Sequence, residues 1–261
     1  HYNDDRTYWD KWFPGDFVVE SFPGQFRNWF YSLLALSTVM EDRAPFKTLL
    51  GHALVKDETG REMHKSWGNT IWFDDAAEEI GVDVMRWMYA NQNIENNLLF
   101  GYGPATEVRR KLITLWNVYS FFATYAAIDG FSPSISNVKN DDLTILDQWI
   151  LAKTNLLNQQ AVAAFERYRV DKFIRHFERF LDDLSNWYIR RSRRRFWKSE
   201  DDADKQAAYQ TLYQVLLISI KVIAPILPFM TEEIYQLSLI HISEPTRLLS
   251  LSDAGVWGEK K

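Results

Sequence analysis

Gly60-Arg61-Glu62-Met63-His64-Lys65-Ser66-Trp67-Gly68-Asn69 is the stretch around which the chain is organised. It follows a β-prone run at residues 49–55 and a polar turn, and it precedes an acidic segment at Asp74-Asp75. A lysine beside a serine on a glycine-flanked loop suits a phosphate site, because the ammonium binds phosphate oxygens and glycine lets the backbone come close. A solvated surface turn has the same composition, and taken alone the stretch favours that alternative.

The residues before this loop predict a strand, a helix and a second strand. Residues 16–20 form a short apolar run ending on Glu20, residues 25–40 have an apolar helical face, and residues 49–55 are β-prone. Phe22-Pro23-Gly24 is predicted to be a turn. This β-α-β order implies a right-handed crossover and a parallel sheet. Ligands bind such sheets beyond the carboxyl ends of the strands, where Glu20 and the Lys65 loop are both expected.

The residues after the loop predict helices. Asp74 or Asp75 is the expected N-cap of the first, Gly81 opens the second, and the run 100–104, with two glycines and a proline, is the expected domain boundary. Residues 105–236 show only helical periodicity, broken at residues 129–140 and before Pro225, with Thr231 expected to cap the last helix. Amphipathic helices with short connections predict an antiparallel bundle. The expected inward positions are Val108, Leu112, Leu115, Trp116, Tyr119, Phe122, Leu146, Trp149, Ile150, Lys153, Leu156, Leu157, Phe173, Phe177, Phe180, Leu184, Trp187, Tyr188, Tyr209, Leu212, Tyr213, Leu216, Leu217, Ile220 and Ile223.

Residues 186–197 form a second informative stretch, in which five arginines alternate with aromatic side chains. This composition is expected where a protein contacts phosphates and stacks on bases. Continuing the apolar stripe from Leu184 and Trp187 places Arg191 and Arg194 on the inward side, where they need a buried partner or an RNA groove. The alternative is a solvated face that complements the helix dipole, and the two interpretations stay open.

Composition excludes few classes of protein. The chain has 261 residues, 46% of them hydrophobic and 25% charged, which is ordinary for a globular protein. A net charge of -5 neither predicts nor excludes nucleic-acid binding, because local patches matter more than the sum. There are no cysteines, so disulfides and cysteine-based zinc sites are excluded, and we expect no metal site. No apolar run reaches the roughly 18 residues of a membrane span. A cytoplasmic protein without membrane partners is expected, and the start at His1 without Met suggests a fragment.

Residues 62–66 resemble the Lys-Met-Ser-Lys-Ser signature of the class I aminoacyl-tRNA synthetases, with Gly68-Asn69 following as in the isoleucyl, valyl and leucyl branch. The resemblance implies catalytic roles for His64, Lys65 and Ser66, and nucleotide contacts for Met63 and Lys65. Two positions depart from the pattern, since Glu62 stands where Lys is usual and His64 where Ser is usual.

Further runs are similar to the isoleucyl members of the family. Residues 14–20 and 27–31 look like a segment in which Glu20 would hold the aminoacyl-adenylate, and Gln25 and His52 match further nucleotide-site positions. Here Pro23-Gly24 replaces the family Asp, and one residue is extra. Residues 186–197 and 224–235 resemble the anticodon domain, which implies tRNA contacts for Arg190, Arg191, Arg193, Arg194, Arg195 and Trp197.

The resemblance covers residues 14–236 in order and implies an α/β plus all-α fold. Residues 1–103 would be the C-terminal part of a Rossmann-type catalytic domain, and residues 104–236 a helical anticodon-binding domain. The expected activity is ATP-dependent joining of isoleucine to its tRNA, with Mg²⁺ accompanying ATP and a monomeric full-length protein. The fragment alone is expected to be inactive. The alternatives are a valyl- or leucyl-type synthetase and a non-catalytic tRNA-binding paralogue.

Residues 237–261 differ in character from the rest of the chain. Residues 237–247 resemble translated sequencing-adapter DNA, so a non-native tail is expected. The alternative is a short strand followed by a polar terminus.

Overall fold

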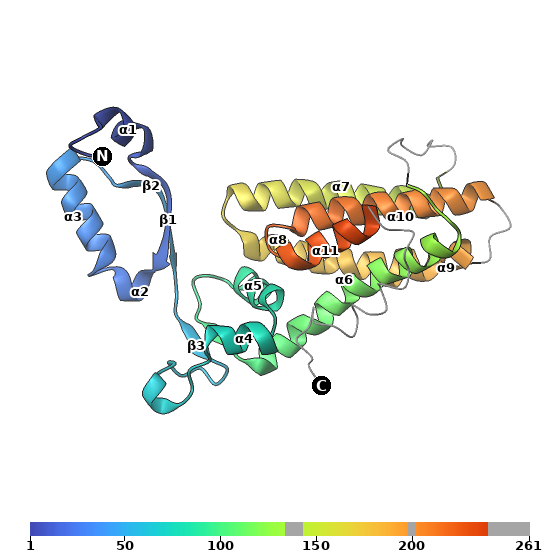
Figure 1. The fold of residues 1–261 in the computed structure, drawn as a ribbon, viewed down its shortest axis with the longest axis horizontal. Helices are drawn as coiled ribbons and strands as arrows, with labels where there is room; N and C mark the ends of the chain where they lie inside the picture. The colour runs from blue at the N-terminus through green and yellow to red at the C-terminus, as the bar shows by residue number, and fades with distance from the viewer. Residues whose placement is uncertain (134–142, 198–201, 240–261) are drawn as a thin grey trace. The chain divides into compact units, whose positions relative to one another are not determined.

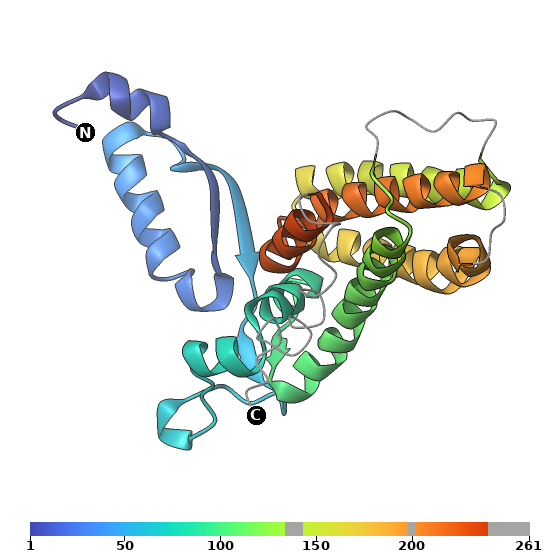
Figure 2. The same ribbon diagram turned by 45° about the vertical axis from the view of Figure 1, so that its right-hand side comes forward.

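The computed structural model describes residues 1–133, 143–197 and 202–239, which form two compact units (Figures 1 and 2). The first unit comprises His1–Thr70 with Gln92–Phe100, and the second comprises Ile71–Asn91 with the described residues from Gly101 onward. Most of the described chain is helical, with two small parallel sheets. None of its described helices is long and apolar enough to cross a membrane.

The first unit contains the predicted β-α-β arrangement. Helix α1 (Arg6–Trp12) precedes strand β1 (Gly15–Ser21), and helices α2 (Phe22–Gln25) and α3 (Trp29–Glu41) connect β1 to strand β2 (Phe46–His52). The two strands are parallel, with Glu20 opposite Gly51 and Ser21 opposite His52. The prediction of a parallel pair joined by a helical crossover is confirmed.

Two predictions in this unit are wrong. Residues 49–55 are not one strand, because β2 ends at His52 and strand β3 (Val55–Asp57) pairs with strand β4 (Leu98–Phe100) in a separate parallel sheet. The chain changes partner between the strands, since Ala53 N donates to Ile94 O at 2.8 Å and Leu98 N donates to Leu54 O at 2.9 Å. Residues 22–24 are not an open turn but begin α2, since the fixed φ of Pro23 fits the first turn of a helix.

The second unit begins with helices α4 (Phe73–Glu79) and α5 (Val82–Asn91) and continues with α6 (Tyr102–Ile128), α7 (Ile145–Glu166) and α8 (Val170–Asp182). Segment η3 (Asp183–Ile189) is a π-helix leading into α9 (Arg190–Trp197), and α10 (Asp202–Ile223) and α11 (Pro228–Leu239) follow. The predicted N-caps are wrong. Trp72 caps α4, and Thr231 lies inside α11, where its hydroxyl donates to Leu227 O at 2.7 Å.

The core of the second unit lies between these helices, with α7 packed against both α8 and α10. The predicted apolar face of α6 is buried over Leu112, Leu115, Trp116, Tyr119 and Phe122, and most inward positions of the later helices are also buried. The predicted inward positions of Leu156 and Trp187 are wrong, because these residues are 47% and 52% exposed.

A single turn of α5 binds the corner between α10 and α11. Asp83 accepts a hydrogen bond from Met230 N at 2.7 Å, in the first turn of α11. Arg86 donates to Ile226 O at 2.9 Å and to Pro225 O at 2.7 Å, just past the end of α10. One helical turn therefore satisfies backbone groups on both sides of the corner.

Candidate functional site

The Lys65 loop is held by two polar side chains at its base. Asp57, the last residue of β3, accepts hydrogen bonds from Thr59 N and Arg61 N at 3.0 and 2.8 Å. Asn69 donates from Nδ2 to the Asp57 carboxylate at 2.8 Å and to Glu62 O at 2.9 Å, and its Oδ1 accepts from His64 N at 3.0 Å. Hydrogen bonds from Asn69, Thr59 and Arg61 hold the pKa of Asp57 far below its usual range, so the carboxylate is an acceptor throughout the physiological range.

The loop presents its central residues to solvent. Lys65 lies in a short 3₁₀ turn, η1 (Lys65–Trp67), which ends at Gly68 in the left-handed conformation with φ 71°. Lys65 and Ser66 are exposed, and Met63 is half-buried. An exposed ammonium on a short turn is the donor chemistry expected for phosphate oxygens, so the loop fits a nucleotide.

The two positions that depart from the family signature contact each other. His64 Nε2 lies 3.3 Å from a Glu62 carboxylate oxygen, and both side chains are exposed. The His64 ring also packs edge-on against Trp67, with 4.4 Å between ring centroids. Glu62 therefore has a local partner within the loop.

Glu20 and His52 lie together at the carboxyl end of the β1–β2 pair, where His52 is opposite Ser21. The Glu20 carboxylate accepts from Ser21 N at 2.8 Å, and His52 Nδ1 lies 2.7 Å from Ala53 O. Because a carbonyl only accepts, Nδ1 carries the proton there, as expected for a histidine that ends a strand. Gln25 accepts from Trp29 N at 3.4 Å at the start of α3.

The structure thus brings Glu20 and His52 to one strand end, whereas Lys65 follows β3 of the other sheet. The expected single sheet edge is replaced by two. The approach of Lys65 to Glu20 and His52 stays a prediction. Within the described ranges, no group of three or more His, Asp or Glu side chains is placed to hold a metal ion.

Two of the five arginines of α9 do not face as predicted. Arg191 and Arg194 are exposed rather than inward, while Ser192 and Phe196 are buried and Arg195 is half-buried. The cause is the π-helical turn of η3, which fits one more residue into a turn than an α-helix and shifts every later side chain around the axis. Tyr188 is buried as predicted, whereas Trp187 is exposed.

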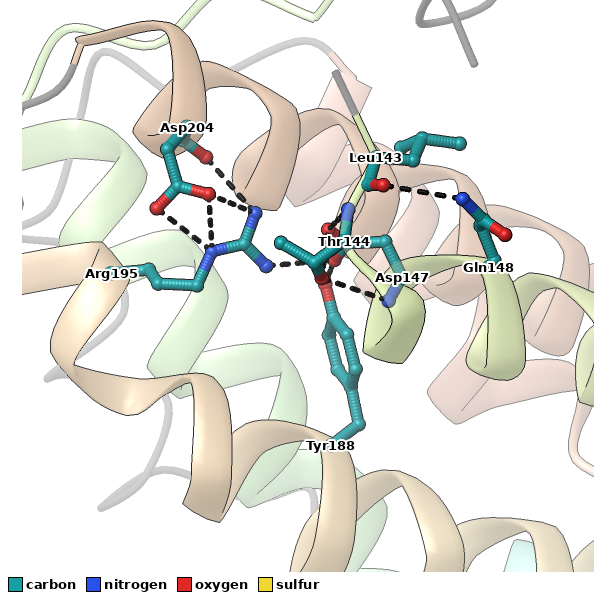
Figure 3. Close-up of polar contacts among 7 residues, drawn as sticks. All are labelled: Leu143, Thr144, Asp147, Gln148, Tyr188, Arg195 and Asp204. Carbon is teal, nitrogen blue, oxygen red and sulfur yellow. Dashed lines mark hydrogen bonds and ion pairs between the residues drawn. The ribbon is translucent and has the colours of Figure 1, made fainter. Parts of the chain in front are cut away.

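Arg195 belongs to a polar cluster with the buried Asp147 and the half-buried Asp204 (Figure 3). Its guanidinium is 2.9 Å from Asp147 Oδ1 and 2.7 Å from Asp204 Oδ1. The Tyr188 hydroxyl donates to Asp147 Oδ1 at 2.6 Å, and Thr144 donates to Asp147 Oδ2 from N and Oγ1 at 2.9 and 2.7 Å. Burial raises the pKa of Asp147, but hydrogen bonds from Arg195, Tyr188 and Thr144 outweigh it and hold that pKa below its ordinary value.

The other four arginines form an exposed set, which we call the α9 basic face: Arg190, Arg191, Arg193 and Arg194. Two exposed tryptophans flank it, since Trp187 is 52% and Trp197 is 55% exposed. The Arg191 guanidinium lies 4.4 Å from the centre of the Trp187 ring, a cation–π arrangement. Exposed arginines beside exposed rings are the chemistry of contact with phosphates and bases.

Two models of known protein families match the chain, one over its N-terminal part and one over its C-terminal part. The sequence model described as tRNA synthetases class I (I, L, M and V) matches residues 1–100. The one described as anticodon-binding domain of tRNA ligase matches residues 147–258. The chain belongs to the class I tRNA synthetases.

The class I synthetases similar to this chain over most of its length include isoleucine–tRNA ligases. The isoleucine–tRNA ligase of Dehalococcoides mccartyi (strain ATCC BAA-2266) is 42% identical to this chain, over 93% of the chain and 24% of the relative. The ligase of Clostridium novyi is 38% identical over 92% of the chain and 23% of the relative. The chain therefore spans about a quarter of the length of these relatives.

Solved synthetase structures share the fold. A Mycobacterium tuberculosis methionyl-tRNA synthetase in complex with methionyl-adenylate matches with a TM-score of 0.72 and 20% identity, over 90% of this chain and 46% of that one. The Agrobacterium radiobacter K84 agnB2 LeuRS-tRNA-LeuAMS complex matches with a TM-score of 0.65 and 18% identity, over 89% and 29%.

Sequence analysis missed the residues that hold these sites together. Asp57 and Asn69 are 12 positions apart, and only the fold of the loop brings them into contact. Asp147 lies on α7, 48 positions before Arg195, and Asp204 lies on α10, the helix that follows α9. The shift in α9 did leave a signal, since Ser192 and Phe196 are the two residues of the run 190–196 that are not arginine, and they are its buried positions.

Proposed function

We propose that this chain is part of an isoleucine–tRNA ligase, which uses ATP to activate isoleucine and then transfers it to tRNA. The observation that carries the proposal is the 42% identity to an isoleucine–tRNA ligase over 93% of the chain. In this proposal residues 1–103 form the C-terminal part of a Rossmann-type catalytic domain and residues 104–236 an antiparallel helical anticodon-binding bundle. Residues 237–261 would be a non-native tail, although α11 extends to Leu239 and the match to the anticodon-binding model extends to residue 258. Residues 240–261 lie outside the described part. The complete ligase would be a cytoplasmic monomer.

The Lys65 loop supports a role in activation. Lys65 and Ser66 would hold the phosphates, Met63 and His52 would lie by the nucleotide, and Glu20 and Gln25 would hold the adenylate. When bound with Mg²⁺, ATP supplies the adenylyl group and a pyrophosphate leaving group. An exposed lysine on an ordered turn stabilises negative charge that grows on phosphate oxygens, so we expect Lys65 to act on the chemical step.

The α9 basic face supports a role in tRNA binding. Its arginines would bind phosphates, so affinity should fall steeply with salt because bound cations are released from the RNA. Trp197, and Trp187 with Arg191 on its ring, would contact bases.

The activity can be tested in a chimera. The segment of the Dehalococcoides mccartyi ligase that matches this chain is replaced by it, and isoleucine-dependent pyrophosphate exchange is measured. Exchange with isoleucine exceeding that with valine or leucine supports the proposal. Exchange dependent on valine or leucine instead would overturn the isoleucine assignment and favour those types of synthetase.

A second candidate function is a non-catalytic tRNA-binding paralogue, favoured by the contact between Glu62 and His64 in the signature loop. A folded chimera that binds isoleucine-acceptor tRNA but shows no exchange, even after Glu62→Lys and His64→Ser restore the usual signature residues, would favour this candidate.

A further inference from the structure

Because of segment η3, the arginines of α9 differ in exposure: four are exposed and one, Arg195, is half-buried. In an uninterrupted α-helix, the stripe through Leu184 would continue onto Trp187, Arg191 and Arg194. The π-helical turn keeps Tyr188 on the inward stripe and places Ser192 on it instead of Arg191, and both Tyr188 and Ser192 are buried. As a result four arginines face solvent and Arg195 faces the protein, with a side-chain exposure of 15%.

Arg195 joins α9 to two other helices. Asp147 lies in the first turn of α7, and its carboxylate completes a capping box with Thr144. Asp204 lies in the first turn of α10. Its carboxylate accepts a hydrogen bond from Arg195 Nε at 2.9 Å, and its backbone carbonyl accepts one from Arg195 Nη2 at 3.2 Å. One planar guanidinium thus donates from Nε and Nη2 to Asp204 and from Nη1 to Asp147 at the same time, a fork of donors that the compact ammonium of lysine does not reproduce.

The basic face needs such an anchor. Helix α9 has eight residues, and like charges three or four positions apart, as at Arg190 and Arg194, repel each other. Helix α9 continues the helical run of α8 and η3 without a break, so its N-terminal end is held by that run. The position of its C-terminal turns depends on contacts with neighbouring helices. The inward contacts of α9 are the buried Ser192 and Phe196 together with the Arg195 cluster.

We propose that Arg195 is a positioning residue for RNA binding: held by Asp147 and Asp204, it fixes α9 so that the basic face presents its four charges in one arrangement. This rests on the proposed tRNA binding and deepens it. Arg195 contributes to RNA affinity by fixing the positions of the four exposed arginines, and its own charge does not contact the RNA.

The proposal and simple electrostatics predict opposite signs for Asp204→Asn. This substitution removes a negative charge close to a basic surface, so Coulomb attraction alone would make RNA binding tighter. If Asp204 acts by holding Arg195, binding becomes weaker although the protein gains net positive charge.

The experiment measures the dissociation constant for an isoleucine-acceptor tRNA transcript by fluorescence anisotropy, with the complete 261-residue chain. Asp204→Asn is compared with Asp204→Glu, which keeps the carboxylate. The charge-matched control is Asp182→Asn, an exposed residue at the end of α8 outside the cluster. Arg195→Lys, which keeps the positive charge, is measured in parallel. Each titration is made well below the variant's unfolding midpoint, with the folded fraction checked by circular dichroism.

We expect Asp204→Asn and Arg195→Lys to weaken binding about tenfold, Asp204→Glu to stay within about twofold of the parent chain, and Asp182→Asn to bind as tightly or slightly tighter. A folded Asp204→Asn variant that binds as tightly as the parent would overturn the proposal. If Asp204→Asn does not fold, Arg195→Lys decides, and unchanged affinity in that variant overturns it as well. A parent chain without affinity for tRNA would instead remove the proposed tRNA binding on which the proposal rests.

Discussion

Asn69 determines the shape of the signature loop more than any residue inside the signature. Its amide contacts the strand end at Asp57 and the two loop residues Glu62 and His64. Lys65 therefore lies on a turn whose ends are tied together by one side chain. These contacts lie within the chain itself, so they lower the entropy cost of binding a ligand.

Replacing Asn69 by Ala should loosen this loop. The His64 amide then loses its acceptor, and one hydrogen bond corresponds to about a fivefold change in local opening. Hydrogen exchange at the His64 amide should accelerate by about that factor. Asn93→Ala removes a comparable side-chain acceptor, for Glu95 N, and should leave His64 unchanged. Equal exchange rates in the Asn69 variant and the parent would contradict the assigned role.

Lys65→Ala tests the chemistry assigned to the same loop. In the chimeric ligase, we expect the maximal rate of pyrophosphate exchange to fall about 100-fold, because the lysine acts on charge that appears in the transition state. The KM for isoleucine should stay within about twofold. Lys47→Ala removes an exposed lysine paired with Asp16 and should leave both constants unchanged. A rate indifferent to Lys65→Ala would end the mechanistic proposal.

At the scale of elements, the β-α-β order and the later helices were predictable, but α1, β4 and the separate pairing of β3 were not. The β-α-β order follows from local periodicity, and β1 and β2 pair as expected. The break between β2 and β3 depends on Ile94 and Leu98, some forty positions away, so no local pattern contains it. In α9 a single π-helical turn was enough to exchange the inward and outward faces.

Trp187 and Tyr188 test this register directly, because they are adjacent and only Tyr188 is buried. Trp187→Ala should change the free energy of unfolding by no more than about 0.5 kcal/mol, as for other exposed positions. Tyr188→Phe removes a donor to buried Asp147 and should cost about 1–2 kcal/mol. Urea unfolding of both variants measures the two values. A larger loss for Trp187→Ala than for Tyr188→Phe would contradict the register seen in the structure.

At the scale of the whole molecule, the Asp147 cluster predicts how stability depends on pH. The folded-state pKa of Asp147 lies below the ordinary value of 3.8, so its contribution is complete above the unfolded-state pKa and is lost as pH falls through the folded-state pKa. The unfolding midpoint should therefore be nearly constant around neutral pH and decrease below about pH 4.

Asp147→Asn provides the comparison. The variant should be less stable than the parent by about 3 kcal/mol at neutral pH, because Arg195 loses a buried partner. The difference should shrink below about pH 4, as the parent loses the same charge by protonation. Thermal unfolding followed by circular dichroism between about pH 2 and pH 7 gives both curves. Parallel curves over that range would show that Asp147 is not the titrating group.

The contacts of α5 with the corner between α10 and α11 constrain the number of residues in that corner. Asp83 and Arg86 are three residues apart on one helix, a rise of about 4.5 Å, and they measure the interval from the carbonyls of Pro225 and Ile226 to the amide of Met230. Adding or removing one residue within that interval would break at least one of the contacts. In related sequences, insertions and deletions should therefore avoid residues 226–230, and any length change found there should coincide with replacement of Asp83 or Arg86.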